Sequence, residues 1–169
     1  MDLDAYVREL DASTEVVRTF AKGCSAEQLA AAKSGGWTVL QVLEHILLTE
    51  RLITAIVARP SERMSPEEEL VGAGKIRHLT VVRRDRKVQA PEVLQPQSTL
   101  RDAAMFEESF MSQRQKLKDN LRSGAILVDH RLHRHPVFGD MSIADWLHFL
   151  IGHTQRHLDQ MREILTPQP

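Results

Sequence analysis

Three histidines stand at positions where their side chains can meet. His153 and His157 lie four residues apart in a strongly apolar segment, and His45 lies inside another long apolar segment. Side chains four residues apart on a helix are neighbours, so the pair can bind one metal ion through two imidazoles. A facing helix needs to present only a third ligand, and His45 can supply it. Three neutral imidazoles with an open position are typical of a catalytic rather than a structural metal site.

The helical faces of these segments favour the same interpretation. At about 100° per residue, His153 and His157 fall within the apolar arc of residues 143–165, whereas His148 falls on the opposite side. His45 also falls among the apolar residues of its own segment. A histidine is costly to bury unless its ring nitrogens find partners. A metal ion bound by all three would be such a partner.

The residues leave two other interpretations open. An inward histidine often bonds a backbone carbonyl or a hydroxyl group, and Thr49 and Thr154 can serve in that way. A rival metal cluster is His130, His133 and His135, just before the last apolar segment. Because arginines stand between these histidines, we expect a surface loop there instead.

The identity of the ion and of any second catalytic group stays open. Imidazole suits zinc first, with nickel, iron and manganese as alternatives. Glu44 and Glu50 are predicted to turn away from His45, so they are not expected at the site. Carboxylates that other parts of the chain can bring as a base or a closing ligand are Glu15, Glu67 to Glu69 and Glu92. Arg114 either holds an anionic substrate or extends from the edge of the core to solvent.

Apolar residues at steps of three and four predict four amphipathic helices. These are expected over residues 2–21, 37–59, 98–122 and 142–165. Ser98 or Thr99 is predicted to cap the third helix and Ser142 the fourth, and Ser123-Gly124 to end the third. No stretch shows sustained alternation of apolar and polar residues, so we expect no sheet. The sequence therefore predicts an all-α four-helix bundle.

A long connection joins the second and third helices. Residues 60–98 are rich in proline and glycine and show weak periodicity. Residues 66–70 are candidates for a short helix, and residues 76–82 for another helix or a brief strand. Such a long connection suits a bundle with a crossover, and we expect it to be the most mobile large segment.

Composition points to a soluble protein of ordinary kind. The 169 residues fit one domain, 1–169, with 42% hydrophobic and 27% charged residues. A formal net charge of −1 gives no case for a nucleic-acid or membrane partner. There is no leader-like start and no apolar stretch of spanning length, and the single Cys24 suits a reducing compartment. We therefore expect a cytoplasmic protein.

Several motifs together resemble the DinB/YfiT-like superfamily. The segment His135–Leu147, followed by His153–Gln160, is similar to the C-terminal signature of that family. Gly36–His45 resembles its segment of a tryptophan followed by a helix with the first histidine. Residues 87–96 resemble the proline-containing stretch ahead of its third helix. The resemblance covers nearly the whole chain, in the expected order and spacing.

The resemblance implies a four-helix bundle in which His45, His153 and His157 hold a divalent metal ion. It also implies a homodimer. Some relatives are S-transferases or isomerases that use a low-molecular-weight thiol, and many have no established activity. A metal-dependent S-transferase acting on a small molecule is therefore the leading hypothesis. The alternatives are a metal-dependent hydrolase and a non-enzymatic, metal-stabilised protein of binding or stress response.

Overall fold

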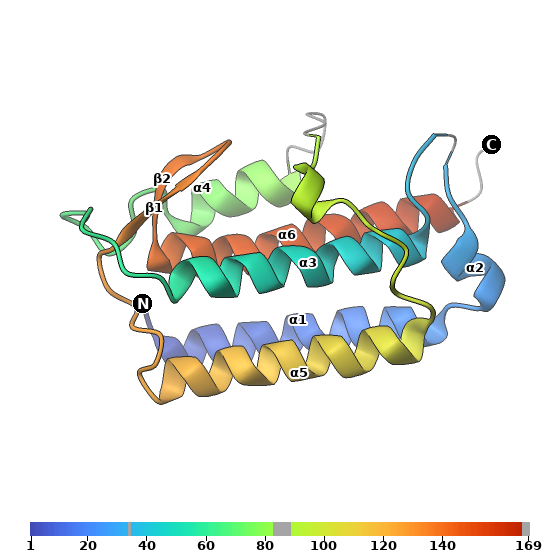
Figure 1. Cartoon of the computed structure of the whole chain (residues 1–169), viewed down its shortest axis with the longest axis horizontal. Coiled ribbons are helices and arrows are strands. Elements are labelled where there is room, and N and C mark those ends of the chain that lie inside the picture. Colours follow the sequence, from blue (N-terminus) through green and yellow to red (C-terminus); the bar gives the residue numbers. More distant parts are fainter. Residues whose placement is uncertain (34, 83–88, 167–169) are drawn as a thin grey trace.

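The computed structural model describes residues 1–33, 35–82 and 89–166, and most of them are helical (Figure 1). The four long helices are α1 (Leu3–Gly23), α3 (Val39–Val57), α5 (Ala103–Arg122) and α6 (Ile143–Leu165). In Figure 1, α3 and α6 lie side by side above the pair α1 and α5. Fully buried side chains between these helices include Leu10, Leu43, Ile46, Phe106, Phe110 and Leu147. The predicted four-helix bundle with a long connection between its second and third helices is confirmed.

Short elements accompany the bundle. After α1, a capping box of Ser25 and Gln28 begins α2 (Ala26–Ala30), a helix that the sequence analysis missed. In the long connection, α4 (Ala73–Arg77) continues into the π-helical turn η1 (His78–Val82), and η2 (Glu92–Leu94) is a single 3₁₀ turn.

The helix predicted over 66–70 does not form. The backbone N–H groups of Leu70, Val71 and Gly72 donate to the buried carboxylate of Asp145 on α6, at 2.9–3.0 Å. This carboxylate competes with local helical hydrogen bonds, because it can accept several N–H groups at once. A helix therefore begins only after this anchor, at Ala73.

A β-hairpin joins α5 to α6 and corrects two predictions. The strands β1 (Leu132–His135) and β2 (Gly139–Ser142) pair in antiparallel fashion, with His135 opposite Gly139. The prediction of no sheet was wrong, and so was that of a loop around His133 and His135. Strands of four residues are too short to show an alternating pattern.

The third long helix begins later than predicted. Asp102 caps α5 in place of Ser98 or Thr99. The N–H groups of Ser98 and Thr99 instead donate to the carboxylate of Glu44 on α3, each at 3.0 Å. Hydrogen bonds thus hold the end of the long connection against α3 just before α5 begins. Ser142 caps α6 as predicted.

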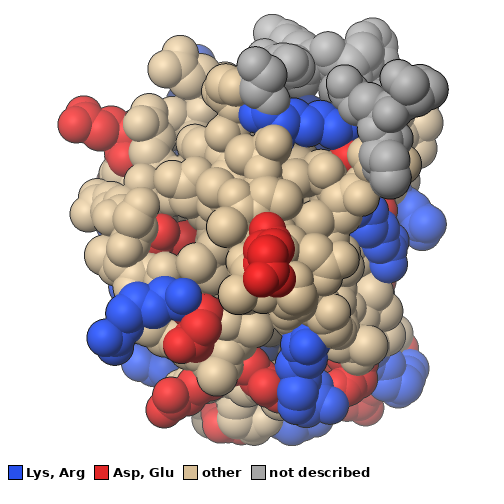
Figure 2. Space-filling view, turned by 90° about the vertical axis from the view of Figure 1, so that its right-hand side faces the viewer, with Lys and Arg blue, Asp and Glu red and all other residues tan. Residues whose placement is uncertain are grey.

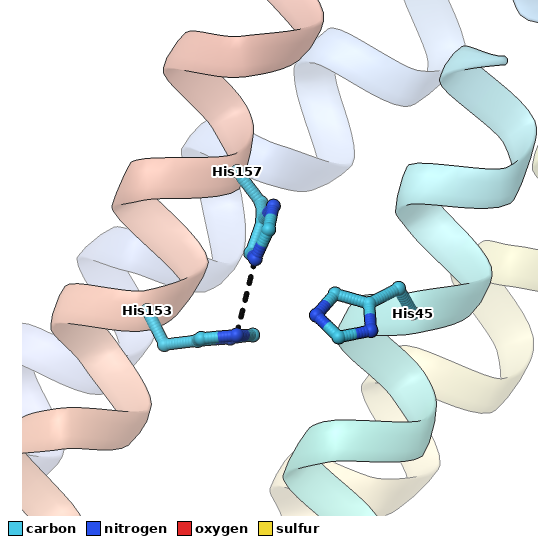
Figure 3. Close-up of side chains that lie close together, drawn as sticks. All are labelled: His45, His153 and His157. Carbon is cyan, nitrogen blue, oxygen red and sulfur yellow. Dashed lines mark hydrogen bonds between the residues drawn. The ribbon is translucent and has the colours of Figure 1, made fainter. Parts of the chain in front are cut away.

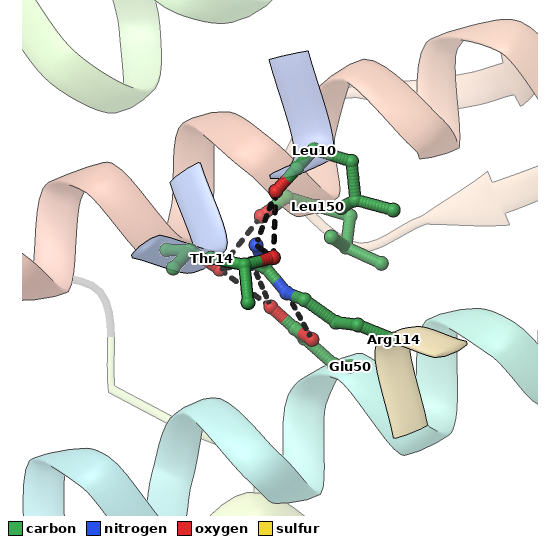
Figure 4. Close-up of polar contacts among 6 residues, drawn as sticks. Leu10, Thr14, Glu50, Arg114 and Leu150 are labelled. Carbon is green, nitrogen blue, oxygen red and sulfur yellow. Dashed lines mark hydrogen bonds and ion pairs between the residues drawn. The ribbon is translucent and has the colours of Figure 1, made fainter. Parts of the chain in front are cut away.

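A buried polar network joins the four long helices (Figure 4). Arg114 on α5 is 2% exposed and pairs with both carboxylate oxygens of Glu50 on α3, at 2.6 and 3.1 Å. It also donates to Leu10 O and Thr14 Oγ1 on α1, and Thr154 of α6 donates to Glu50 at 2.8 Å. Arg114 therefore neither reaches solvent nor offers its guanidinium to a substrate, and both predicted roles were wrong.

Figure 2 shows the end of the bundle that carries α2. Uncharged residues cover most of its centre, and acidic and basic side chains alternate along the lower edge, where α1 and α5 lie. Between these helices, Arg18 and Lys22 form ion pairs with Glu107. Among the described residues, no helix combines the length and the apolar character that crossing a membrane requires.

Candidate metal centre

The three histidines predicted from the sequence meet between α3 and α6 (Figure 3). His45 projects from α3, and His153 and His157 project from consecutive turns of α6. One ring nitrogen of each lies within 4.8 Å of those of the other two. The His45 ring centroid lies 5.2 Å from that of His153 and 4.7 Å from that of His157. The side chains thus converge on one point between the helices.

The spacing of the nitrogens fits the ligands of one ion. With metal–nitrogen bonds of about 2.0–2.1 Å, two ligands on a tetrahedral or octahedral ion lie about 2.9–3.4 Å apart. Nε2 of His153 and Nε2 of His157 are 3.1 Å apart. Two lone pairs at this distance repel each other unless a proton or a cation lies between them. The donor set therefore suits a divalent ion.

Outer hydrogen bonds orient two of the three rings. His45 Nδ1 lies 2.8 Å from the Leu94 carbonyl, and because a carbonyl only accepts, this nitrogen carries the proton. His157 Nδ1 likewise donates to Gln160 Oε1 at 2.7 Å. Each bond leaves Nε2 as the unprotonated nitrogen, directed toward the other rings. His153 Nδ1 is buried, and no described side chain or backbone group bonds it.

Burial favours the neutral form of two of the three rings, those of His45 and His153. Burial lowers the pKa of His45 below its ordinary value, although the hydrogen bond to Leu94 opposes the shift. Burial also lowers the pKa of His153 well below its ordinary value, and the nearby His157 and His45 lower it further. Neutral imidazole is the form that binds a metal. Two of the three candidate ligands are therefore held in the form that can bind a cation.

Aromatic rings flank the histidines on two sides. The ring centroids of Trp37 and His45 lie 5.0 Å apart, and those of Phe149 and His153 lie 5.3 Å apart. These rings add apolar walls around the polar nitrogens. Apolar surroundings restrict water and strengthen electrostatic interactions at a metal site.

Carboxylates are absent from the cluster within the described parts of the chain. Glu44 and Glu50 turn away as predicted, because one bonds residues 98–99 and the other bonds Arg114. Of the carboxylates considered as a base or a closing ligand, Glu15 pairs with Arg18 and Glu69 bonds His148. The described residues therefore offer three candidate ligands, all of them histidines.

The rival histidine cluster does not converge. His130 Nδ1 bonds the Ser65 carbonyl at 3.1 Å, whereas His135 Nδ1 accepts two N–H groups of the hairpin turn. His133 Nε2 is buried, and no described group bonds it. Only His45, His153 and His157 have the spacing of metal ligands in the part of the chain that the structure describes.

Comparisons with known proteins agree with this fold. The YuaE protein of Bacillus subtilis (strain 168), itself uncharacterized, is 26% identical over 145 residues, which cover 85% of this chain and 86% of YuaE. The crystal structure of TT2238, a four-helix bundle protein, matches with a TM-score of 0.54 and 18% identity, covering 95% of this chain and 98% of that one. The family model of the DinB superfamily matches residues 9–161, a range that includes all three histidines. The chain therefore belongs to the DinB superfamily.

Proposed function

We propose that His45, His153 and His157 bind one divalent metal ion, with zinc as the first candidate. We further propose that the protein is a metal-dependent enzyme, a thiol-dependent S-transferase acting on a small molecule. The observation that supports this best is the convergence of three imidazoles. Two of them, His45 and His157, form hydrogen bonds through Nδ1 to Leu94 and Gln160. Such outer bonds are typical of histidines that bind metals.

The ligand set favours an anionic partner at the open position. A bound divalent ion would lower the pKa of a coordinated thiol or water. Three neutral imidazoles leave the double positive charge of the ion uncompensated. In the described structure, the neighbouring rings of Trp37 and Phe149 add no charge of their own. A thiolate is thus a matched partner for this site, and hydroxide is its competitor in the hydrolase alternative.

Metal analysis of histidine variants tests the site. His45→Ala, His153→Ala and His157→Ala should each lose most of the metal, because the two remaining imidazoles chelate it weakly. His148→Ala is the matched control on the same helix, since its ring bonds Glu69 away from the cluster. Full metal content in all three ligand variants would refute the site.

Cobalt substitution tests the open position. A low-molecular-weight thiol should change the visible spectrum of the cobalt protein, and thiol removal should restore it. An unchanged spectrum at saturating thiol, with cobalt still bound, would refute the transferase proposal. A panel of thiol-transfer and hydrolase substrates then separates the two enzymatic alternatives.

We also propose a homodimer in the cytoplasm. Membership of the family supports the dimer, and the single Cys24 suits a reducing compartment. Sedimentation at micromolar concentration tests the assembly, because a species of 19.2 kDa alone would remove the dimer from the proposal.

A further inference from the structure

Two buried polar atoms beside the proposed metal site have no partner among the described protein groups. They are His153 Nδ1 and Thr49 Oγ1. His45 and His157 bond Leu94 and Gln160 through the same ring nitrogen, so His153 is the exception. A buried donor or acceptor without a partner destabilises the folded state, because it loses its hydrogen bonds to water and gains none. Both atoms therefore need a partner that the described protein groups do not supply.

Contacts between α3 and α6 on either side of Thr49 place it near the level of His153. The His45 ring packs against the His157 ring, and the Glu50 carboxylate accepts from Thr154. The later residue of α3 contacts the earlier residue of α6, so the two helices run antiparallel. Thr49 directly precedes Glu50 and lies one turn after His45. It therefore shares the face of α3 that carries His45 and lies between two residues that contact α6.

The hydroxyl of Thr49 makes no hydrogen bond to its own helix. Two other buried threonines donate to the carbonyl four residues earlier, Thr14 at 2.7 Å and Thr80 at 2.8 Å, and the hydroxyl of Thr154 donates to Glu50 at 2.8 Å. Thr49 makes no such bond, although it is only 4% exposed. Its hydroxyl is thus available for a partner in the interface between α3 and α6.

A hydroxyl suits His153 in both states of the site. Without metal, His153 Nε2–H can donate to His157 Nε2, and Nδ1 is then an acceptor. With metal on Nε2, Nδ1 carries the proton and is a donor. A hydroxyl, directly or through water, can both donate and accept. It therefore satisfies His153 whether or not metal is bound.

We infer that Thr49 is the outer hydrogen-bond partner of His153 and positions this ring for metal binding through one ordered water molecule. The water is required because Thr49 and His153 make no direct hydrogen bond. Two otherwise unpaired polar atoms are the minimum that holds a buried water. This inference rests on the proposed metal site. It makes Thr49 a positioning residue, which acts through His153 and does not touch the metal.

Zinc affinity of Thr49 variants tests the inference. Thr49→Val removes the hydroxyl at nearly constant volume and should weaken zinc binding about tenfold or more, as loss of outer bonds does elsewhere. Thr49→Ser keeps the hydroxyl and should bind like the wild type. Thr54→Val, on the same helix and half-buried, is the matched control. Affinities are measured by competition with a chromophoric chelator.

Nuclear magnetic resonance of the zinc-loaded protein provides a second, local measurement. The Nδ1–H proton of His153 should exchange slowly with solvent, and Thr49→Val should accelerate that exchange about tenfold while leaving His45 Nδ1–H unchanged. Unchanged affinity and exchange in Thr49→Val, with zinc bound by the wild type, would overturn the inference alone. No zinc binding by the wild type would overturn the proposed function and the inference together.

Discussion

Acid should destabilise the protein through His135, which the fold holds in its neutral form. His135 Nδ1 accepts hydrogen bonds from the N–H groups of Val137 at 3.1 Å and Phe138 at 3.2 Å, in the turn between β1 and β2. The ring is only 8% exposed and packs against Trp146 and Phe149. Protonation of Nδ1 would break both hydrogen bonds and bury a charge. Burial lowers the pKa of His135 to about 4.

The magnitude follows from the difference between the folded and unfolded pKa values. An unfolded histidine has a pKa of about 6.5, so between about pH 6.5 and pH 4 the unfolded chain binds more protons at His135 than the folded protein does. The contribution of neutral His135 to stability is therefore fully present above about pH 6.5 and is lost as the pH falls toward about 4. The pKa difference of about 2.5 corresponds to about 3 kcal/mol in the free energy of unfolding.

The variant His135→Asn isolates this contribution. Its side-chain oxygen can accept the two N–H groups in place of Nδ1, and it does not titrate. Urea unfolding in the presence of a chelator, at about pH 7.5 and about pH 4.5, gives the free energy of unfolding of both proteins. The wild type should lose about 2–3 kcal/mol more than the variant over this interval. Contributions of the other histidines cancel in the comparison, so equal losses would refute the reasoning.

Three further predictions concern the fold. Arg114→Met leaves the Glu50 carboxylate buried without its cation and should lower the free energy of unfolding by about 3–5 kcal/mol in urea titrations. The double variant Arg114→Met/Glu50→Met removes the unpaired charge as well and should recover much of the lost free energy. Gly152→Ala should lower the free energy of unfolding by about 1–3 kcal/mol, because its new Cβ would lie 2.6 Å from Thr80 Oγ1. Adding Thr80→Ala to the same chain should restore the lost stability, as measured by thermal unfolding. Amide hydrogen exchange should be fast over 60–82 and 89–98 apart from hydrogen-bonded amides, such as those of residues 70–72, which bond Asp145, those within the helical residues 73–82, and that of Ser98, which bonds Glu44. Exchange as slow as in α3 across the whole of 60–82 and 89–98 would contradict the prediction.

Periodicity alone predicted the bundle and the meeting of its histidines. The apolar arcs of α3 and α6 are long enough to fix which side chains face inward, and His45, His153 and His157 lie within them. The predicted cap Ser142 is the N-cap of α6, and the predicted start of the second long helix at residue 37 lies within two residues of the start of α3 at Val39. Local signals therefore located both the elements and the candidate site.

Features that depend on residues far apart in the chain could not be predicted from the sequence. The sequence pattern indicates only that Asp145 is an acidic residue in the first turn of a helix. Its carboxylate also accepts hydrogen bonds from residues 70–72, which are far away along the chain. Arg114 reads as a core-edge arginine because its partner, Glu50, belongs to another helix. No local pattern gives the partner of a charged residue, so both assignments required the tertiary structure.

The polar anchors on α3 explain how the chain holds its three histidines together through protein contacts alone. Glu44 and Glu50 stand on either side of His45 along the helix, and each is buried. Glu44 holds residues 98–99, just beyond the turn whose Leu94 carbonyl orients His45, whereas Glu50 binds Arg114 and Thr154, the neighbour of His153. Because these bonds fix α3 against α6, they also fix the distance between His45 and the histidine pair. Stability and metal affinity should therefore be coupled through Glu50, and a variant that loosens this network should weaken both.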